Sequence, residues 1–177
     1  MTFSFQSFKR AKALKCFAST VKTGLIPLSE IKTAMTFLDA SSRSFEECRS
    51  AVSDFYRQNG IDGNFLYLDL RNFSRKVTLK TAPQRTVTLK DLNWYGKVRT
   101  EKLTPILRCN SDLFISLINS KDYPVHFLTS AYNAKLKIGR QDYSGGVPDV
   151  VISDFWGNRM SDTECFSLVE DYLHKIK

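Results

Sequence analysis

Apolar side chains recur every three or four residues in two segments of the N-terminal third, and this spacing predicts an amphipathic helix in each. The first segment spans residues 4–23 and is followed by Gly24, a residue type that commonly ends helices. The second follows Ser44, which with Glu47 has the spacing of an N-terminal capping box. Between them, residues 28–40 fit a helical stripe and one face of a strand equally well, because period alone does not decide a run this short.

Strand patterns begin at residues 64–70, which are rich in aromatic and aliphatic side chains. The tetrapeptide Val-Thr-Leu-Lys then occurs at 77–80 and again at 87–90, on either side of a turn that contains Pro83. Alternation places valine and leucine on one face and lysine and threonine on the other, which predicts a β-hairpin. Its lysines either keep an edge from pairing with other strands or form a cationic platform.

Short helical and strand patterns alternate in the C-terminal half. The predicted elements are a helix at 111–120, strands at 125–130, 134–140 and 150–152, and a last helix that starts at a capping box of Ser161 and Glu164. With 177 residues, 42% of them hydrophobic, the chain fits one domain with a sizeable core. We expect a single α+β domain over residues 25–177, with a mainly antiparallel sheet and a few packed helices, preceded by a basic N-terminal arm or helix over 1–24.

Basic residues outnumber acidic ones by 26 to 18, which gives a formal net charge of +8. Ten basic and two acidic residues lie between 71 and 108, so this stretch alone has an excess equal to that of the whole chain. Such a patch favours polyanionic partners, either nucleic acid or ribonucleoprotein or an anionic membrane surface. The alternative is a basic face that only keeps the protein in solution.

The candidate binding residues are the cations of this stretch and those near the N-terminus. The electrostatic candidates are Lys9, Arg10, Lys12, Lys15, Arg71, Arg75, Lys76, Lys80, Arg85, Lys90, Lys97, Arg99 and Lys102. Aromatic side chains close to these cations are suited to stack on bases or to insert into a lipid surface. The candidates for this role are Phe5, Phe8, Trp94 and Tyr95.

Few residues suggest catalysis. Neither of the two histidines, His126 and His174, has a flanking partner typical of a catalytic dyad, and the common phosphate-loop, nucleophile and zinc-protease motifs are absent from the sequence. Asp149 and Asp154 bracket an apolar run and resemble the first part of the Mg²⁺-binding motif of PD-(D/E)xK nucleases, but no acidic-x-Lys follows. We therefore expect a protein that is not an enzyme and has no cofactor or metal, with a Mg²⁺-dependent nuclease as an alternative.

Cysteine spacing and hydropathy indicate the compartment. The four cysteines, Cys16, Cys48, Cys109 and Cys165, are far apart and form no CxxC pair, which favours free thiols in a reducing compartment over a zinc site. The sequence has no run of about 18 apolar residues and no apolar core of a signal peptide at its start. A cytoplasmic or nuclear location is expected.

Residues 31–70 are similar to part of a known protein family. They read IKTAMTFLDASSRSFEECRSAVSDFYRQNG and then GNFLYLDL, and this stretch resembles the matrix proteins of rhabdoviruses, with matching residues at Phe45, Ala51, Val52, Phe55 and Tyr56. The resemblance implies a strand over 28–40, followed by a polar turn, an amphipathic helix and a hydrophobic strand. It further implies a structural protein that condenses ribonucleoprotein, self-associates and contacts the inner membrane leaflet. The PPxY and PTAP budding motifs are absent from the sequence.

Two binding hypotheses follow. The first is a structural viral matrix protein that binds ribonucleoprotein and anionic membrane and self-associates in virion assembly, in the host cytoplasm and on the inner face of the virion membrane. The second is a basic nucleic-acid-binding module without membrane affinity, whose face is formed by the hairpin, Trp94 and Tyr95.

Overall fold

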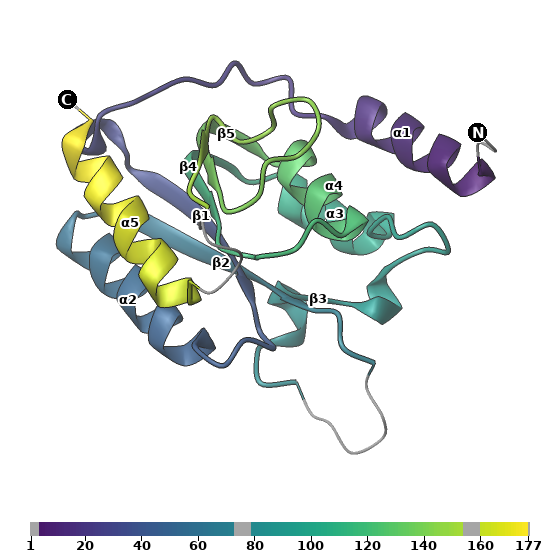
Figure 1. Ribbon diagram of the computed structural model, residues 1–177, viewed down its shortest axis with the longest axis horizontal. Helices are drawn as coiled ribbons and strands as arrows, with labels where there is room; N and C mark the ends of the chain where they lie inside the picture. Colours follow the sequence, from purple (N-terminus) through teal and green to yellow (C-terminus); the bar gives the residue numbers. More distant parts are fainter. Residues whose placement is uncertain (1–3, 73–78, 154–159, 177) are drawn as a thin grey trace.

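Six strands form one sheet in the computed structural model, which describes residues 4–72, 79–153 and 160–176 (Figure 1). The strands are β1 (Thr33–Asp39), β2 (Asp62–Asp69), β3 (Thr86–Thr88), β4 (Asn110–Ser116), β5 (Asn133–Gly139) and β6 (Val150–Val151). Their order is β3-β2-β1-β4-β5-β6, and every neighbouring pair is parallel. The order of the strands therefore reverses between β1 and β4.

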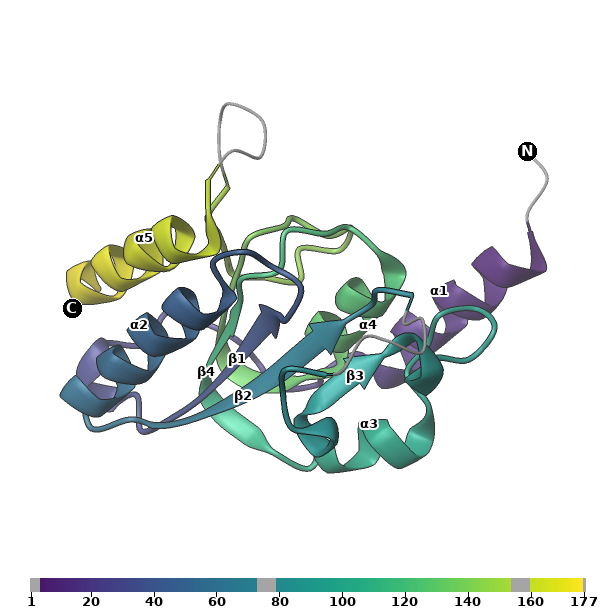
Figure 2. The same cartoon turned by 90° about the horizontal axis from the view of Figure 1, so that it is seen from below.

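Helices cover both faces of this sheet. They are α1 (Phe5–Phe17), α2 (Phe45–Gln58), α3 (Thr100–Leu107), α4 (Tyr123–Ala131) and α5 (Asp162–Lys175), with short 3₁₀ turns η1 (Leu28–Glu30), η2 (Pro83–Arg85) and η3 (Leu89–Asp91). Helices α2 and α5 pack on one face, whereas α1, α3 and α4 pack on the other (Figure 2). The result is a three-layer α/β fold.

The central strands are apolar on both sides, as expected when helices cover both faces of a sheet. In β4, Ile115 packs toward α2 and α5, and Phe114 packs toward α4. In β1, Leu38 likewise packs toward α2 and α5, and Phe37 packs toward α4. All four side chains are fully buried. Burying a side chain of this size stabilises the fold by about 1.5–3 kcal/mol, so each face of the sheet has its own stabilising core.

The prediction of a mainly antiparallel sheet is wrong, because all five strand pairs among the described residues are parallel. The second copy of the tetrapeptide contributes to β3, which pairs in parallel with β2, and the chain then turns away as η3. In the first copy, residues 77 and 78 lie outside the described residues, and Leu79 and Lys80 are not in a strand. The predicted hairpin is therefore not formed by the described part of the repeat.

For two elements the predicted secondary structure is wrong, because a predicted helix is a strand and a predicted strand is a helix. Residues 111–120, predicted as a helix, hold most of β4, and residues 125–130, predicted as a strand, lie in α4. A strand that is buried on both faces has no polar alternation, so its pattern matches that of a short buried helix. Helix α4 is itself buried nearly all round, and the clearest local sign of its start is Pro124 in the first turn.

The other predicted elements are confirmed, with shifted ends. The N-terminal helix is α1, residues 28–40 hold η1 and β1, the strands at 64–70, 134–140 and 150–152 are β2, β5 and β6, and the helices after Ser44 and Ser161 are α2 and α5. The Ser161–Glu164 capping box forms, with hydrogen bonds of 2.7 and 3.2 Å. The side chain of Ser44 makes no capping hydrogen bond.

The four cysteines are free, with Cys48 and Cys165 buried and the other two exposed. Burial raises the pKa of Cys48 to about 12 and that of Cys165 to about 11, so neither thiol is an activated nucleophile. Within the described ranges, no helix has the length and apolar character needed to span a membrane.

Candidate functional site

Charge is separated between two ends of the molecule. Residues 4–22 carry five basic and no acidic side chains, and residues 79–108 carry seven basic and two acidic ones. Helices α2 and α5 together carry seven acidic and three basic side chains, and they lie at the opposite end from α1 (Figure 1). Positive potential therefore gathers on the side of α1.

Helix α1 docks onto α4 and onto the loop that precedes α3. Arg10 Nε donates to the carbonyl oxygen of Tyr95 at 2.7 Å, and its guanidinium lies 4.8 Å from the centre of the Tyr123 ring. Lys97 Nζ lies 3.9 Å from the centre of the Phe17 ring. A cation over an aromatic face contributes about 0.5–2 kcal/mol, so the sequence-predicted residues Arg10, Tyr95 and Lys97 hold α1 in place.

Three large aromatic side chains are exposed beside this contact. Phe5, Phe8 and Trp94 expose 65%, 57% and 63% of their surface. The rings of Phe5 and Trp94 are stacked, with centroids 5.8 Å apart and planes 7° from parallel, and Lys9 Nζ lies 5.2 Å from the centre of the Phe5 ring. Three- and four-residue spacing puts the α1 members and the exposed Lys12 on one stripe. We call this surface, made of Phe5, Phe8, Lys9, Lys12 and Trp94, the aromatic–basic face.

The other predicted cations have different surroundings. Arg71, Arg99 and Lys102 donate hydrogen bonds to nearby carboxylate or carbonyl groups. The remaining candidates are Lys15, Lys80, Arg85 and Lys90, which are exposed, and Arg75 and Lys76, which lie outside the described residues. The fold thus brings Phe5 next to Trp94 and Arg10 next to Tyr95. The full predicted patch stays a prediction.

A second candidate site is the carboxyl edge of the sheet. Sheets of this strand order commonly bind ligands where the order reverses, here between β1 and β4. A cavity of about 240 Å³ lies there, with polar walls from Asp39, Ser41, Arg71, Ser120 and Asp122. Asp39 already accepts the amide and hydroxyl hydrogens of Ser41, at 2.8 and 2.6 Å. The segment between β1 and α2 has no glycine, and the first turn of α2 carries Glu46 and Glu47, whose charges disfavour a bound phosphate. This edge therefore gives no support for a nucleotide site.

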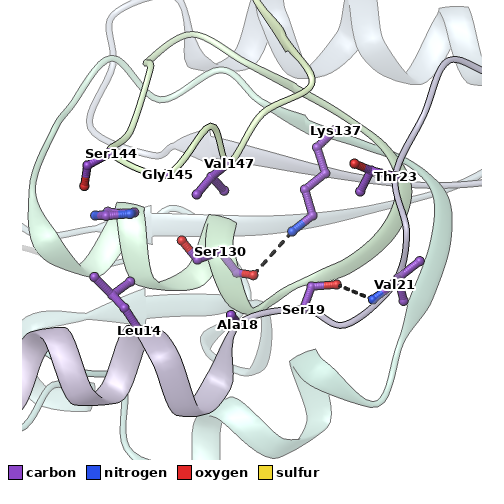
Figure 3. Close-up of a pocket in the computed structure, with 11 residues that line it drawn as sticks. Leu14, Ala18, Ser19, Val21, Thr23, Ser130, Lys137, Ser144, Gly145 and Val147 are labelled. Atoms are coloured by element: carbon purple, nitrogen blue, oxygen red, sulfur yellow. Dashed lines mark hydrogen bonds between the residues drawn. The ribbon is translucent and has the colours of Figure 1, made fainter.

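A cavity of about 350 Å³ lies between α4, β5 and the segment that follows α1, and we call it the Lys137 pocket (Figure 3). Lys137 is 3% exposed, and its Nζ donates to the carbonyl oxygens of Thr129 at 2.9 Å and Ser130 at 3.4 Å. These carbonyls lie in the last turn of α4, where a cation suits the helix dipole. Burial lowers the pKa of Lys137 to about 8, although the carboxylate of Asp149 acts in the opposite direction.

The pocket has further polar walls. The hydroxyl of Ser130 is buried and has no hydrogen-bond partner within the part of the chain that is described. His126 is half-buried and stacks on Tyr143 with ring centroids 4.7 Å apart, and burial lowers its pKa. The cavity reaches solvent past the exposed residues Ala18 and Gly145. It therefore combines a desolvated amine, an imidazole and a free hydroxyl in an accessible space.

Asp149, the residue that suggested a nuclease, is occupied by structural contacts. One of its carboxylate oxygens accepts the backbone N–H of Lys137 at 2.7 Å, and the other accepts the hydroxyl hydrogen of Thr23. Asp154 lies outside the described residues. Among the residues that are described, no group of three or more His, Cys, Asp or Glu side chains could hold a metal ion.

Lys137 was not among the sequence-predicted site residues. Alternation along β5 puts Lys135 and Lys137 on the same side of the strand, and such a pattern usually indicates a solvent face. In a sheet with helices on both faces, the middle of that side is covered, so Lys137 is enclosed whereas Lys135 near the strand start is exposed. The signal that would have identified Lys137 is the parallel character of the sheet.

Residues 5–164 match the model of a family described as a family of unknown function (DUF6913), and the chain belongs to this family. Neither the curated proteins nor the solved structures include a match to the chain. These comparisons do not bear on the resemblance to rhabdovirus matrix proteins.

Proposed function

We propose that the protein binds single-stranded nucleic acid through the aromatic–basic face. The observation that carries this proposal is the exposed Phe5–Trp94 stack, which lies beside Lys9 on the basic end of the molecule. Stacking of a base on an aromatic ring contributes about 1–3 kcal/mol and tolerates any base. Neighbouring cations neutralise backbone phosphates, and the release of counterions adds a salt-dependent contribution.

A single strand suits this face better than a duplex does. Its bases are free to stack on Phe5 and Trp94, whereas the bases of a duplex are already stacked on one another. A duplex would offer the cations its phosphates but would leave the aromatic rings without a partner. A preference for single strands therefore measures the aromatic contribution separately from the electrostatic one.

A membrane surface suits the same face less well. The apolar side of α1, with Ala13, Leu14 and Phe17, packs against the core instead of facing outward. Helices that lie in a membrane interface present a continuous apolar side to the lipid, and here only the exposed aromatic residues remain for that role. The viral matrix hypothesis requires both nucleic-acid and membrane binding, so the same experiments address it.

The proposal is tested by fluorescence anisotropy with labelled single-stranded RNA and DNA and with a matched duplex, over a series of salt concentrations. Wild-type protein is expected to bind the single strands more tightly than the duplex and more weakly as salt rises. Trp94→Ala is expected to weaken binding about tenfold, because one stacking contact is lost. Leu168→Ala is the matched control, since it removes an apolar side chain that is 46% exposed on α5 at the acidic end.

Equal affinity of Trp94→Ala and wild type would contradict the role of the aromatic stack. Flotation with anionic vesicles forms a second arm of the experiment. The wild type could bind vesicles but no oligonucleotide, and Trp94→Ala could lose the vesicle binding. That result would identify a membrane, and not nucleic acid, as the partner.

A further inference from the structure

The Lys137 pocket holds two polar groups that the fold does not use fully. Lys137 Nζ donates to two carbonyl oxygens at the end of α4, and a tetrahedral nitrogen has one further position for a partner. The Ser130 hydroxyl, in a residue that is 8% exposed, lines the same cavity and has no hydrogen-bond partner among the described residues. Buried polar groups without a partner are rare in folded proteins, and a bound ligand would account for this one.

Burial also favours the neutral form of the amine. Because burial lowers the pKa of Lys137 to about 8, an appreciable fraction of the side chain is uncharged near neutral pH. A neutral amine has two N–H bonds and a lone pair, and donation of both hydrogens to the two carbonyls leaves the lone pair at the remaining position. The titratable groups around it are the Asp149 carboxylate, His126 on α4, and Tyr143, which stacks on His126. A desolvated amine in this state is a nucleophile.

The lining of the cavity limits what it accepts. A volume of about 350 Å³ fits a small metabolite and excludes a polymer. Leu14, Val21 and Val147 form apolar walls, and the described residues that line the cavity include no acidic side chain. A small carbonyl compound with an apolar substituent matches these walls.

We propose that Lys137 binds a small aldehyde or ketone reversibly as an imine in this pocket. The nitrogen lone pair attacks the carbonyl carbon, a C–N bond forms, and one nitrogen proton passes to the carbonyl oxygen, which becomes a hydroxyl group. The hydroxyl group then leaves as water with the second nitrogen proton, and the C=N bond forms. Amine and carbonyl thus yield imine and water without any oxidant or reductant. His126 and Ser130 line the cavity and act as the proton carriers.

Reductive trapping of the full chain tests this proposal. Native protein is treated near neutral pH with propanal or pyruvate and sodium cyanoborohydride, and the modified lysines are identified by peptide mass spectrometry. Lys137 is expected to react at least about tenfold faster than Lys135, because a larger fraction of its amine is neutral. Lys135 lies on the same strand, and its hydrogen bond to Asp112 raises its pKa, so it is the matched internal control.

Variants separate this chemistry from a structural role. Lys137→Arg keeps a cation at the end of α4 and is expected to fold, as circular dichroism would show, but to lose trapping at this position. His126→Gln and Ser130→Ala are expected to slow trapping several-fold with native unfolding behaviour. If Lys137 in the wild type reacts no faster than Lys135, the amine only caps α4 and the proposal fails. Trp94→Ala is expected to react like the wild type, so this result does not depend on the proposed nucleic-acid binding.

Discussion

The aromatic–basic face and the Lys137 pocket use the same cation in opposite environments. Lys9 and Lys12 lie on the outer side of α1, where they act at a distance through the potential they create. Lys137 lies beneath α4, where desolvation lowers its pKa and favours the neutral amine. Its nitrogen acts on groups that it contacts directly. The comparison teaches that burial, and not residue type, sets the charge state of a lysine in this protein. The two proposals rest on that difference: exposed lysines would attract a polymer, and the buried one would react with a small molecule.

Among the buried charged groups, the largest expected loss of stability comes from breaking an ion pair at the end of β5. Arg140 Nη1 lies 2.6 Å from a carboxylate oxygen of Asp162, and the two side chains are 4% and 12% exposed. Arg140→Met is expected to lower the free energy of unfolding by about 3–5 kcal/mol, because it leaves the Asp162 charge buried without a partner. Urea denaturation near neutral pH measures this loss.

Two further variants sharpen that measurement. The double variant Arg140→Met with Asp162→Leu is expected to regain much of the lost stability, because no unpaired charge remains. Asp54→Ala removes an exposed pair with Arg57 and should cost less than about 1 kcal/mol. Similar costs for Arg140→Met and Asp54→Ala would mean that the β5 pair is not enclosed in solution.

Features set by local sequence patterns could be predicted from the sequence, whereas features set by long-range contacts could not. Helices α2 and α5 have clear amphipathic periods, and they were predicted. The pairing of Thr86 with Tyr67 in parallel is a long-range event that no local pattern specifies, so the sheet type was predicted wrongly. Phe5 and Trp94 were each predicted as candidates for stacking or insertion, but their stack on each other depends on how α1 docks. Lys137 was overlooked because its burial follows from the sheet type.

A carboxylate beside β5 gives the next largest effect. One oxygen of Asp112 accepts the backbone N–H groups of Lys32 and Thr33 at 2.9 and 3.0 Å, and the other lies 2.7 Å from Lys135 Nζ. Burial alone would raise the pKa of Asp112, but these hydrogen bonds prevail and lower it to about 2. Asp112→Ala is therefore expected to cost roughly 2 kcal/mol of stability near neutral pH.

The pH dependence of this variant checks its cause. Since the folded-state pKa is lowered, the stabilisation is complete above the ordinary carboxyl pKa and is lost as the pH falls toward 2. Urea denaturation at several acidic pH values is expected to show the difference between wild type and Asp112→Ala shrinking in that window. A difference that stays constant with pH would indicate a packing effect without a charge contribution.

Lys137 is expected to show a pH dependence of the same sign as Asp112, but in an alkaline window. Its folded-state pKa is lowered, so the unfolded chain binds more protons between about pH 8 and the ordinary lysine pKa, and stability rises with pH across that window. Relative to Lys137→Met, the wild type is expected to gain about 2 kcal/mol between about pH 7 and 9.5. Thermal or urea unfolding at the two pH values measures the gain, and the exposed Lys135→Met serves as control. A gain of equal size in both comparisons would show that Lys137 is not specifically desolvated.

The smallest effect on stability, and the sharpest test of the exposed side of the comparison, is expected from Lys12→Glu. Stability should change by less than about 0.5 kcal/mol, because the side chain is exposed on α1. Binding to single-stranded oligonucleotides should weaken, and the slope of log K against log salt should fall by about 1, because one phosphate contact is lost. Lys175→Glu makes the same charge change on α5 at the acidic end and should leave that slope unchanged. If both variants reduce the slope equally, binding follows net charge alone, and the aromatic–basic face is not a distinct site.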